Sequence, residues 1–343
     1  MPNWMIKSAV QRVISGLPRS HAWNGLFQRY VTRGLDLGIG EFEAKLNACR
    51  KHFENYRHFS PRPRAGFRAL ELGTGWFPIL PVGLHLCGAS EIWTFDIAPL
   101  LRDFTFKQTL LLFCEYDQKG ALHKFLPAAR PERITNLHGS VARAAEQAPE
   151  ALLKALNIHV LVRDARQTGL PSKSIDLVFS NVVLEHIPRA ELADLFAEVR
   201  RVCADEAVIS HYVGMADQYA SFDRSITPFN FLKYPASRWR LLDNPIIPQN
   251  RLRISDYRSL LQEAGCSIVK ELHTSGSTEA LRQVKLAPEF RKYSQEDLLV
   301  LFAWIVARPN AIPKCSLVAE AEPIVPHAMP ERAADIQSPA SPR

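Results

Sequence analysis

Apolar and polar positions along residues 65–308 form blocks, and the blocks predict strands separated by helices. In several of the intervening stretches apolar residues recur at the three- and four-residue spacing of a helix, as at 189–203. Alternation of strands and helices is typical of a mainly parallel α/β sheet. The predicted strands are the short apolar runs at residues 67–71, 91–97, 159–163, 175–183, 207–213, 266–272 and 298–307.

Two of the predicted helices carry signals at their ends. In the helix expected at 78–88, Pro78 and Pro81 fall in the opening turn, where proline is tolerated. Ser255 is predicted to cap a later helix that continues to about Ala264, and Gly265 is predicted to stop it.

Changes in hydrophobic pattern and composition divide the chain into an N-terminal helical segment (1–64), an α/β domain (65–308) and a tail (309–343). The tail is rich in Ala, Pro and Glu and is predicted to be disordered. Two insertions are long for connections in such a domain. The first, residues 98–158, has helical periodicity and is interpreted as a helical cap, and the second is a loop over residues 214–250.

An amphipathic helix is predicted at residues 4–17, and a second helical pattern runs from about Gly25 to Tyr56. The first helix could pack on the domain as a lid or rest weakly on a membrane surface; its few Lys and Arg residues favour packing. Its predicted apolar stripe consists of Trp4, Met5, Val10, Val13, Ile14 and Leu17.

The net charge of +7 is concentrated at the N-terminus. Residues 1–64 hold 11 of the 42 basic and 4 of the 35 acidic residues, so the rest of the chain is balanced. A general nucleic-acid-binding surface on the domain is therefore not expected. A solvated, mildly basic helical face is the favoured explanation of the N-terminal excess of positive charge.

The six cysteines are scattered and mostly have apolar neighbours. None has the close spacing of a zinc or redox motif, so reduced, buried thiols are expected. No long apolar run predicts a membrane span and no signal-peptide core opens the sequence. These features favour a cytoplasmic protein.

The phrase Glu71-Leu72-Gly73-Thr74-Gly75 joins a predicted strand to a glycine turn and a helix. Glycine lets the backbone turn sharply and lets a ligand approach the main chain closely. Asp96 ends the next strand, where a carboxylate can accept hydrogen bonds from both ribose hydroxyls of a nucleoside. Pro78 stands where a dinucleotide fingerprint has its third glycine, and Glu71 would repel a pyrophosphate. Both residues disfavour NAD and favour a cofactor with a cationic amino-acid part.

In this order and spacing the motifs resemble those of class I S-adenosylmethionine-dependent methyltransferases over about residues 67–213. The glycine phrase resembles motif I, and Arg163-Asp164-Ala165 resembles the pair after strand three. The stretch 175–181, followed by Leu184-Glu185-His186-Ile187, resembles the fourth-strand motif. One departure is Phe77, where the family has a small residue. Trp76 and Phe77 could wall the cofactor pocket or pack the first helix against the sheet.

The resemblance implies a Rossmann-like, doubly wound sheet of seven strands, mostly parallel with an antiparallel last strand. It implies S-adenosyl-L-methionine as the cofactor, with Asp96 at the ribose and Asp164 at the adenine amino group. The cofactor-binding residues implied are Glu71, Gly73, Thr74, Gly75, Asp96, Ile97, Asp164, Ala165 and Ser180.

Methyl transfer to a hydroxyl needs a base as well as alignment, and histidine is the usual base near neutral pH. His186 follows strand four and His211 ends strand five, so both are catalytic candidates; a helix-opening and a buried structural role are the alternatives. Asp217, Tyr219 and Asp223 are weaker candidates. No metal site is expected, because the suitable acids already have roles at the cofactor.

The function predicted is methyl transfer to an O or N nucleophile of a small-molecule or glycan-like acceptor, with residues 214–250 on the acceptor side. The aromatic and arginine-rich stretch 220–240 could grip a polar ring or simply pack over the domain. Two alternatives are an RNA methyltransferase that docks through residues 1–64 and a non-catalytic cofactor-binding protein. Nucleic acid is disfavoured because residues 180–183 lack a base-flipping phrase.

Overall fold

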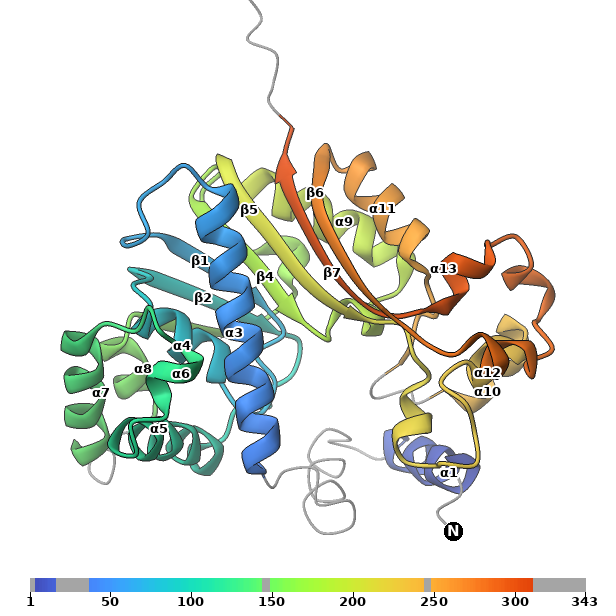
Figure 1. The fold of residues 1–343 in the computed structure, drawn as a ribbon, viewed down its shortest axis with the longest axis horizontal. Helices are drawn as coiled ribbons and strands as arrows, with labels where there is room; N and C mark the ends of the chain where they lie inside the picture. The colour runs from blue at the N-terminus through green and yellow to red at the C-terminus, as the bar shows by residue number, and fades with distance from the viewer. Residues whose placement is uncertain (1–3, 17–36, 144–148, 244–247, 311–343) are drawn as a thin grey trace, which may run out of the picture. The chain divides into compact units, whose positions relative to one another are not determined.

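The computed structural model describes residues 4–16, 37–143, 149–243 and 248–310, which contain a seven-stranded sheet in the order β3-β2-β1-β4-β5-β7-β6 (Figure 1). The predicted Rossmann-like fold is confirmed. The strands are β1 (Arg68–Leu72), β2 (Glu91–Asp96), β3 (Ile158–Val162), β4 (Ile175–Asn181), β5 (Cys203–Gly214), β6 (Cys266–Ser275) and β7 (Val300–Pro309).

The first five strands run parallel, and β7 is antiparallel to both of its neighbours, β5 and β6. From β1 the chain first builds outward through β2 to β3, then crosses back to add β4 on the other side. Ligands of open α/β sheets bind at the carboxyl ends of the strands where the order reverses in this way. The topology therefore places the expected site at the ends of β1 and β4.

Helices cover both faces of the sheet, because strand side chains alternate between two apolar surfaces. One face packs against α3 (Ile39–Phe59) and α4 (Ile79–Leu86) in a cluster that includes Leu46, Phe53 and Leu84. The other face packs against α9 (Arg189–Val202) and α11 (Ile254–Glu263). Gly265, at φ +76°, ends α11 as predicted.

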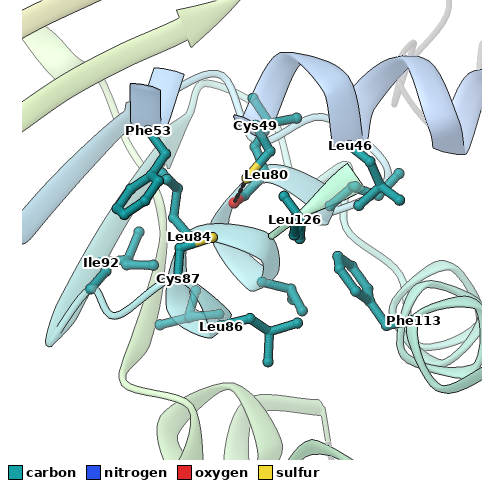
Figure 2. Packing of buried hydrophobic residues seen from close by; sticks show 14 of the residues in the cluster. Leu46, Cys49, Phe53, Leu80, Leu84, Leu86, Cys87, Ile92, Phe113 and Leu126 are labelled. Carbon is teal, nitrogen blue, oxygen red and sulfur yellow. Dashed lines mark hydrogen bonds between the residues drawn. The ribbon is translucent and has the colours of Figure 1, made fainter. Parts of the chain in front are cut away.

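The contact between α3 and α4 is close because Gly83 has no side chain. A Cβ there would lie 2.6 Å from the Cys49 sulfur. The Cys49 thiol instead donates to the Leu80 carbonyl at 3.5 Å, among the leucines that fill the space between the two helices (Figure 2). This packing fixes the position of α3 beside the carboxyl end of β1.

The insertion 98–158 consists of α5 (Asp103–Gln118), α6 (Leu122–Phe125), α7 (Pro131–Arg143) and α8 (Pro149–Ala155). Its Phe106, Leu110 and Phe113 join the same apolar cluster as α3 and α4. The insertion therefore extends the core on that face of the sheet and lies beside α4 (Figure 1).

A second, smaller core forms from residues 215–243 and 276–299, two segments far apart in sequence. It contains Phe229, Phe231 and Trp239 from the aromatic stretch, which therefore packs inward. The sequence did not indicate the second segment, which interrupts the connection between β6 and β7. The helical elements of this small lobe are η3 (Gln218–Ser221), η4 (Asn230–Lys233), α10 (Ala236–Leu242), α12 (Thr278–Arg282), η5 (Pro288–Phe290) and α13 (Gln295–Leu299).

The N-terminal helix α1 (Trp4–Ser15) packs on this small lobe through Trp4 of the predicted stripe, together with Ser8 and Gln11, which are outside the stripe. Trp4 inserts between Tyr219 and Tyr234, with ring centroids 5.4 and 5.9 Å away. Met5 and Val13 of the stripe are 49% and 70% exposed, which corrects the prediction. Hydrogen bonds decide the orientation: Ser8 and Arg12 donate to backbone carbonyls at the end of α10. Leu17 lies outside the described residues.

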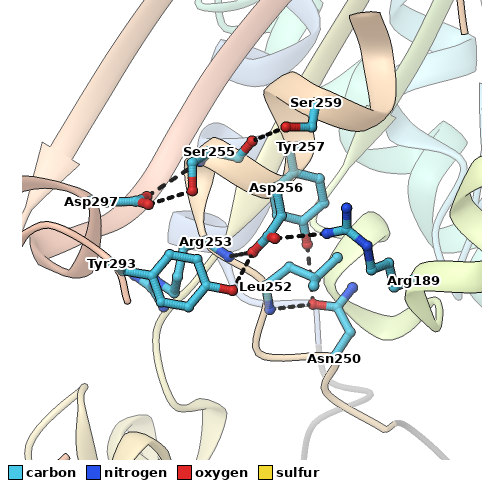
Figure 3. A network of polar contacts seen from close by, with 10 residues as sticks. All are labelled: Arg189, Asn250, Leu252, Arg253, Ser255, Asp256, Tyr257, Ser259, Tyr293 and Asp297. Atoms are coloured by element: carbon cyan, nitrogen blue, oxygen red, sulfur yellow. Dashed lines mark hydrogen bonds and ion pairs between the residues drawn. The ribbon is translucent and has the colours of Figure 1, made fainter. Parts of the chain in front are cut away.

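The start of α11 differs from the prediction. Arg253, not Ser255, is the N-cap residue, and the Asp256 carboxylate accepts from the Arg253 amide at 2.9 Å. The Ser255 hydroxyl instead donates to Asp297, which joins α11 to α13 (Figure 3). Helical pattern alone could not distinguish the two starts, because the partner Asp297 is distant in sequence.

The remaining predictions concern thiols, membrane spans and the tail. Cys49, Cys87, Cys114, Cys203 and Cys266 are buried free thiols, as predicted, and Cys315 lies outside the described residues. Within the described ranges, none of the helices has the length and apolar character needed to span a membrane. The stretch 311–343, where disorder was predicted, also lies outside the described residues.

Candidate functional site

A cavity of about 690 Å³ lies at the carboxyl ends of β1, β2, β3 and β4. Its size is within the usual range for small-molecule sites. Of the predicted cofactor residues, all except Ser180 line it. The structure thus brings together Glu71, Gly73, Thr74, Gly75, Asp96, Ile97, Asp164 and Ala165, with His186 on the same wall.

The glycine turn that follows β1 requires glycine for two separate reasons. Gly73 and Gly75 adopt φ +77° and +66°, the left-handed region that other residues avoid. A Cβ on Gly73 would also lie 2.5 Å from a methyl group of Val183, whereas one on Gly75 would meet no atom within 4 Å. Gly73 therefore lets the β1 turn lie directly against the end of β4, and Gly75 leaves space open for a ligand.

Asp96 fixes the turn from the neighbouring strand. One carboxylate oxygen accepts from the Gly75 amide at 3.0 Å and the other from the Ala98 amide at 3.1 Å. Ile97, between them, is 79% exposed at the edge of the cavity. The acid predicted for a ribose is thus in place on the wall, with an exposed apolar side chain beside it.

Glu71 is buried within the wall, at 4% exposure, and its Oε2 has no hydrogen-bond partner among the described residues. Burial raises the pKa of its carboxyl to about 8, while Thr94 and Lys45 act in the opposite direction. A buried carboxyl oxygen without a hydrogen bond lowers the stability of the protein unless a donor reaches it. A ligand carrying an ammonium group would supply that donor.

Asp164 follows β3, and its carboxylate is bound by Arg166, two residues later in the sequence. Its carboxylate caps the short helix η1 (Ala165–Gln167) and accepts from Arg166 Nε and Nη2 at 2.8 and 2.6 Å. The Arg166 side chain therefore lowers the pKa of the Asp164 carboxyl. Arg166 also pairs with Glu191 at 3.6 Å, and all three side chains line the cavity.

Trp76 and Phe77, at the departure from motif I, have both of the roles considered for them. Both line the cavity. Phe77 is also buried in the main core, and Trp76 packs partly against it. A small residue at position 77 would leave space that this chain fills with an aromatic ring.

Ser180 and His211 do not line the cavity. They are adjacent residues on β4 and β5, both fully buried, and His211 Nδ1 lies 2.8 Å from the Ser180 hydroxyl. Burial lowers the pKa of His211 to about 3. Both side chains point toward α9, where Phe196 packs on the imidazole. The structure thus favours the buried structural role for His211 and gives Ser180 no contact with the cavity.

His186 does reach the cavity, from the short helix η2 (Leu184–His186) after β4. Its Nδ1 lies 2.8 Å from the Pro248 carbonyl, an acceptor only, so Nδ1 carries the proton. The neutral ring then has Nε2 as its basic nitrogen. Burial lowers the pKa of His186, so the neutral form is present at neutral pH.

The three weaker candidates organise the small lobe. Asp217 is buried and accepts from Asn230 Nδ2 at 3.0 Å and from the Tyr219 amide at 2.9 Å. Asp223 accepts from the Trp4 amide at 3.0 Å and so helps to hold α1. These contacts give Asp217 and Asp223 structural roles.

Polar wall residues that were not found from the sequence include Lys45 on α3, Asn181 at the end of β4 and Glu191 on α9. Asn181 has a buried side-chain oxygen without a partner in the described parts of the chain. Its position as the last residue of a buried strand was a usable signal. Lys45 had none, because only the packing of α3 brings it to the wall. No group of three or more potential metal ligands occurs within the described ranges.

Comparison with known proteins agrees with this geometry. A family model described as a methyltransferase domain matches residues 119–210, a range that includes Asp164 and His186 but not the glycine turn. No curated protein matches the sequence.

Many solved structures resemble the chain at low identity. An S-adenosylmethionine-dependent methyltransferase from Mesorhizobium loti is 16% identical, with 74% of this chain and 96% of that chain covered and a TM-score of 0.40. A geranyl diphosphate C-methyltransferase from Streptomyces coelicolor A3(2), in complex with Mg²⁺, geranyl diphosphate and S-adenosyl-L-homocysteine, is 12% identical. The match covers 76% of this chain and 78% of that chain, with a TM-score of 0.42.

The strand order, the cavity at the topological switch point and the match of residues 119–210 to a methyltransferase domain agree with one another. They support a class I S-adenosylmethionine-dependent methyltransferase, the family that the motifs resemble. The cofactor that this resemblance implies is S-adenosyl-L-methionine. Its fit is supported by Gly75, where the missing Cβ leaves open space on the cavity wall, and by the Glu71 Oε2 atom, which has no partner among the described residues.

Proposed function

We propose that this enzyme methylates an O or N nucleophile of a small-molecule or glycan-like acceptor, with His186 as the general base. The observation that carries the proposal is the orientation of His186. Its Nδ1 is held by the Pro248 carbonyl at 2.8 Å, and its ring lines the cofactor cavity. A base needs this fixed tautomer to have its free nitrogen in place before the acceptor arrives.

The cofactor residues act by position. Asp96, Ile97 and Asp164 lie at the ends of β2 and β3, where they would hold the nucleoside. Glu71 and the glycine turn lie at β1, on the side of His186 and Asn181. In this orientation the reacting part of the ligand would lie beside the end of β4.

When bound, the cofactor supplies a methyl group on a sulfonium, and the electron pair of the broken C–S bond stays on sulfur. His186 Nε2 accepts the proton that the acceptor oxygen or nitrogen loses as its new bond to carbon forms. The apolar residues of the wall, including Phe77 and Leu100, exclude water from the reacting atoms. The acceptor is expected to enter beside the 214–250 loop, because Pro248 lies on the cavity wall next to His186.

The test combines acceptor discovery with one variant. The enzyme is incubated with methyl-labelled cofactor and fractionated cell metabolites, glycans and RNA, and the labelled pool is identified. Label in a small-molecule or glycan fraction supports the proposal. Label in RNA alone, or no label in any fraction, contradicts it.

With the acceptor in hand, His186→Gln should lower kcat by about 10²- to 10⁴-fold while the Kd for S-adenosylhomocysteine stays within about twofold. The limb of the pH–rate profile that reports the base should disappear. His138→Gln is the matched control, since His138 pairs with Asp117 at 2.7 Å on the distant insertion. Equal kcat values for the two variants would exclude His186 as the base.

A further inference from the structure

The cavity wall carries opposite charges at one end. Following the sheet order, Asp164 lies at β3, Asp96 at β2 and Glu71 at β1. Glu71 faces the same side of the sheet as Ala69, which belongs to the core under α3 and α4. Lys45 of α3 lines this same end of the cavity.

Glu71 supplies the hydrogen-bond acceptor at this end of the cavity. Its carboxyl is buried, and Oε2 has no partner among the described residues although it belongs to the wall of an open cavity. Lys45, Asp96 and Thr94 are the groups that act on its ionisation. A ligand ammonium is the partner that would satisfy the free oxygen and offset the cost of the buried charge.

Lys45 supplies the positively charged donor at this end of the cavity, and the packing of α3 holds its backbone in place. One helical turn further along α3, Cys49 packs on Gly83 and donates to the Leu80 carbonyl (Figure 2). The side chain of Lys45 is 25% exposed; its ammonium lies 3.4 Å from the Glu41 carboxylate and 5.7 Å from the centre of the Phe77 ring. The pair with Glu41 is a surface i,i+4 pair, which contributes little and is easily exchanged.

The other cations on the wall are engaged elsewhere. Arg166 bonds Asp164 and pairs with Glu191, and Arg163 donates to the Thr168 carbonyl at 3.2 Å. Both belong to the β3 end of the cavity, the end opposite Glu71. Lys45 is thus the cation placed to meet an anionic group bound next to Glu71.

We propose that Lys45 binds the carboxylate of the cofactor's amino-acid part, while Glu71 accepts from its ammonium, so that Lys45 selects the carboxylated cofactor. This inference rests on the proposed function and deepens it. It makes α3, which lies outside the family match at 119–210, a part of the cofactor site. An ammonium and a carboxylate on one carbon match an acid and a base that line the same cavity and interact electrostatically.

The experiment compares three ligands that share the adenosine part: S-adenosylhomocysteine, its decarboxylated analogue and 5′-methylthioadenosine, which lacks the whole amino-acid group. Binding to full-length protein is measured by calorimetry. Lys45→Met should weaken S-adenosylhomocysteine by about 10- to 100-fold and change the other two ligands by less than about twofold. Lys45→Arg should retain most of the affinity.

Two further variants test the role of the charge and provide a control. Lys45→Glu should reverse the preference and bind the decarboxylated analogue more tightly than S-adenosylhomocysteine. Lys107→Met is the matched control, because Lys107 on α5 also forms an i,i+4 pair, with Asp103 at 3.0 Å. It should leave all three affinities unchanged, and thermal melts should show that every variant is folded.

The outcomes separate this inference from the function on which it rests. If wild-type protein binds none of the three ligands, the proposed function fails. If wild-type binds them and Lys45→Met weakens S-adenosylhomocysteine and the decarboxylated analogue equally, or neither, Lys45 does not select the carboxylate and only the inference is overturned.

Discussion

Two polar regions, on opposite sides of β4 in the sheet, differ in whether their buried polar groups find hydrogen-bond partners within the chain. Around Arg253, at the start of α11, the buried polar side-chain atoms other than Arg253 Nε have partners within the chain (Figure 3). Around Glu71, at the end of β1, a buried carboxylate oxygen has none among the described residues. We call these the closed cluster (Arg189, Asn250, Arg253, Ser255, Asp256, Tyr257, Tyr293 and Asp297) and the open cluster (Lys45, Glu71, Thr74, Gly75 and Asp96).

The closed cluster joins elements that are distant in sequence. The fully buried guanidinium of Arg253 donates to the carbonyls of Met215, Leu298 and Val300, at the ends of β5, α13 and β7. Asn250 donates to the carbonyls of Leu184 and Ile187, on both sides of His186. The closed cluster therefore supports the small lobe and the turn that carries the catalytic candidate.

The difference shows how polar groups in a protein interior divide between stability and binding. A network completed within the chain stabilises the fold, since each group regains the hydrogen bonds it loses on leaving water. A network left incomplete beside a cavity costs stability until a ligand completes it. Substitutions should therefore affect stability in the closed cluster and affinity in the open cluster.

The largest expected effect is in the closed cluster. Arg253→Met keeps much of the apolar volume but leaves three buried carbonyls without their donor, and should lower the free energy of unfolding by about 3–5 kcal/mol. Urea titration measures it. Arg258→Met, which removes a half-exposed pair with Glu271, should cost about 0–1 kcal/mol. If Arg253→Met instead weakened S-adenosylhomocysteine without loss of stability, the division between the clusters would be wrong.

The second effect belongs to the turn beside the open cluster. Gly73→Ala forces a Cβ into the left-handed region and against Val183, so it should cost about 2–3 kcal/mol of apo-protein stability. Gly75→Ala has the same backbone strain without the clash and should cost only about 1–2 kcal/mol. Equal losses in the two variants would mean that β1 and β4 do not approach as closely as the structure indicates.

The strands and the glycine turn could be predicted because they depend on local pattern. The turn, Asp96 and Asp164 follow successive strands, and parallel strands bring their carboxyl ends to one edge. Sequence was sufficient to predict that edge. It was insufficient for Ser180 and His211, because the period of two in a strand does not say which face meets the cavity.

Features that depend on distant partners could not be predicted. Lys45 reaches the wall because α3 packs on α4, where Cys49 lies against Gly83. The small lobe joins residues 215–243 to 276–299, and its buried Arg251 bonds the carbonyls of Phe231 and Tyr234. An arginine in a polar stretch gives no sign of such burial.

The third prediction is the pH dependence of apo-protein stability. Burial raises the pKa of Glu71 and of Glu185 to about 8, so the folded state keeps protons that the unfolded state has lost above about pH 4.5. Stability from these groups is therefore lost as the pH rises toward 8. His52 and His211, with pKa values lowered to about 3, act in the opposite direction, but only below about pH 6.5.

Between pH 6.5 and 8 the carboxyls should therefore dominate, and the free energy of unfolding should fall. Glu71→Gln should flatten this fall and exceed the wild type at pH 8 by about 1–2 kcal/mol. The same variant should bind S-adenosylhomocysteine more weakly, since an amide does not attract an ammonium. Glu185→Gln is the matched control: it should also flatten the fall, but Glu185 accepts from the Gly214 amide and does not line the cavity. Unchanged affinity for Glu71→Gln would remove Glu71 from the open cluster.

The smallest effect tests how complete the closed cluster is. The Tyr293 hydroxyl donates to Asp256 Oδ2 at 2.8 Å, while Arg189 and the Arg253 amide also hold this carboxylate. Because two donors remain, Tyr293→Phe should cost only about 1 kcal/mol. In an Asp256→Asn background the loss should be smaller still, and this difference measures the coupling. A loss of 3 kcal/mol or more would mean that the hydroxyl, not the arginines, holds Asp256. Cofactor affinity should stay constant throughout, because neither Tyr293 nor Asp256 lines the cavity.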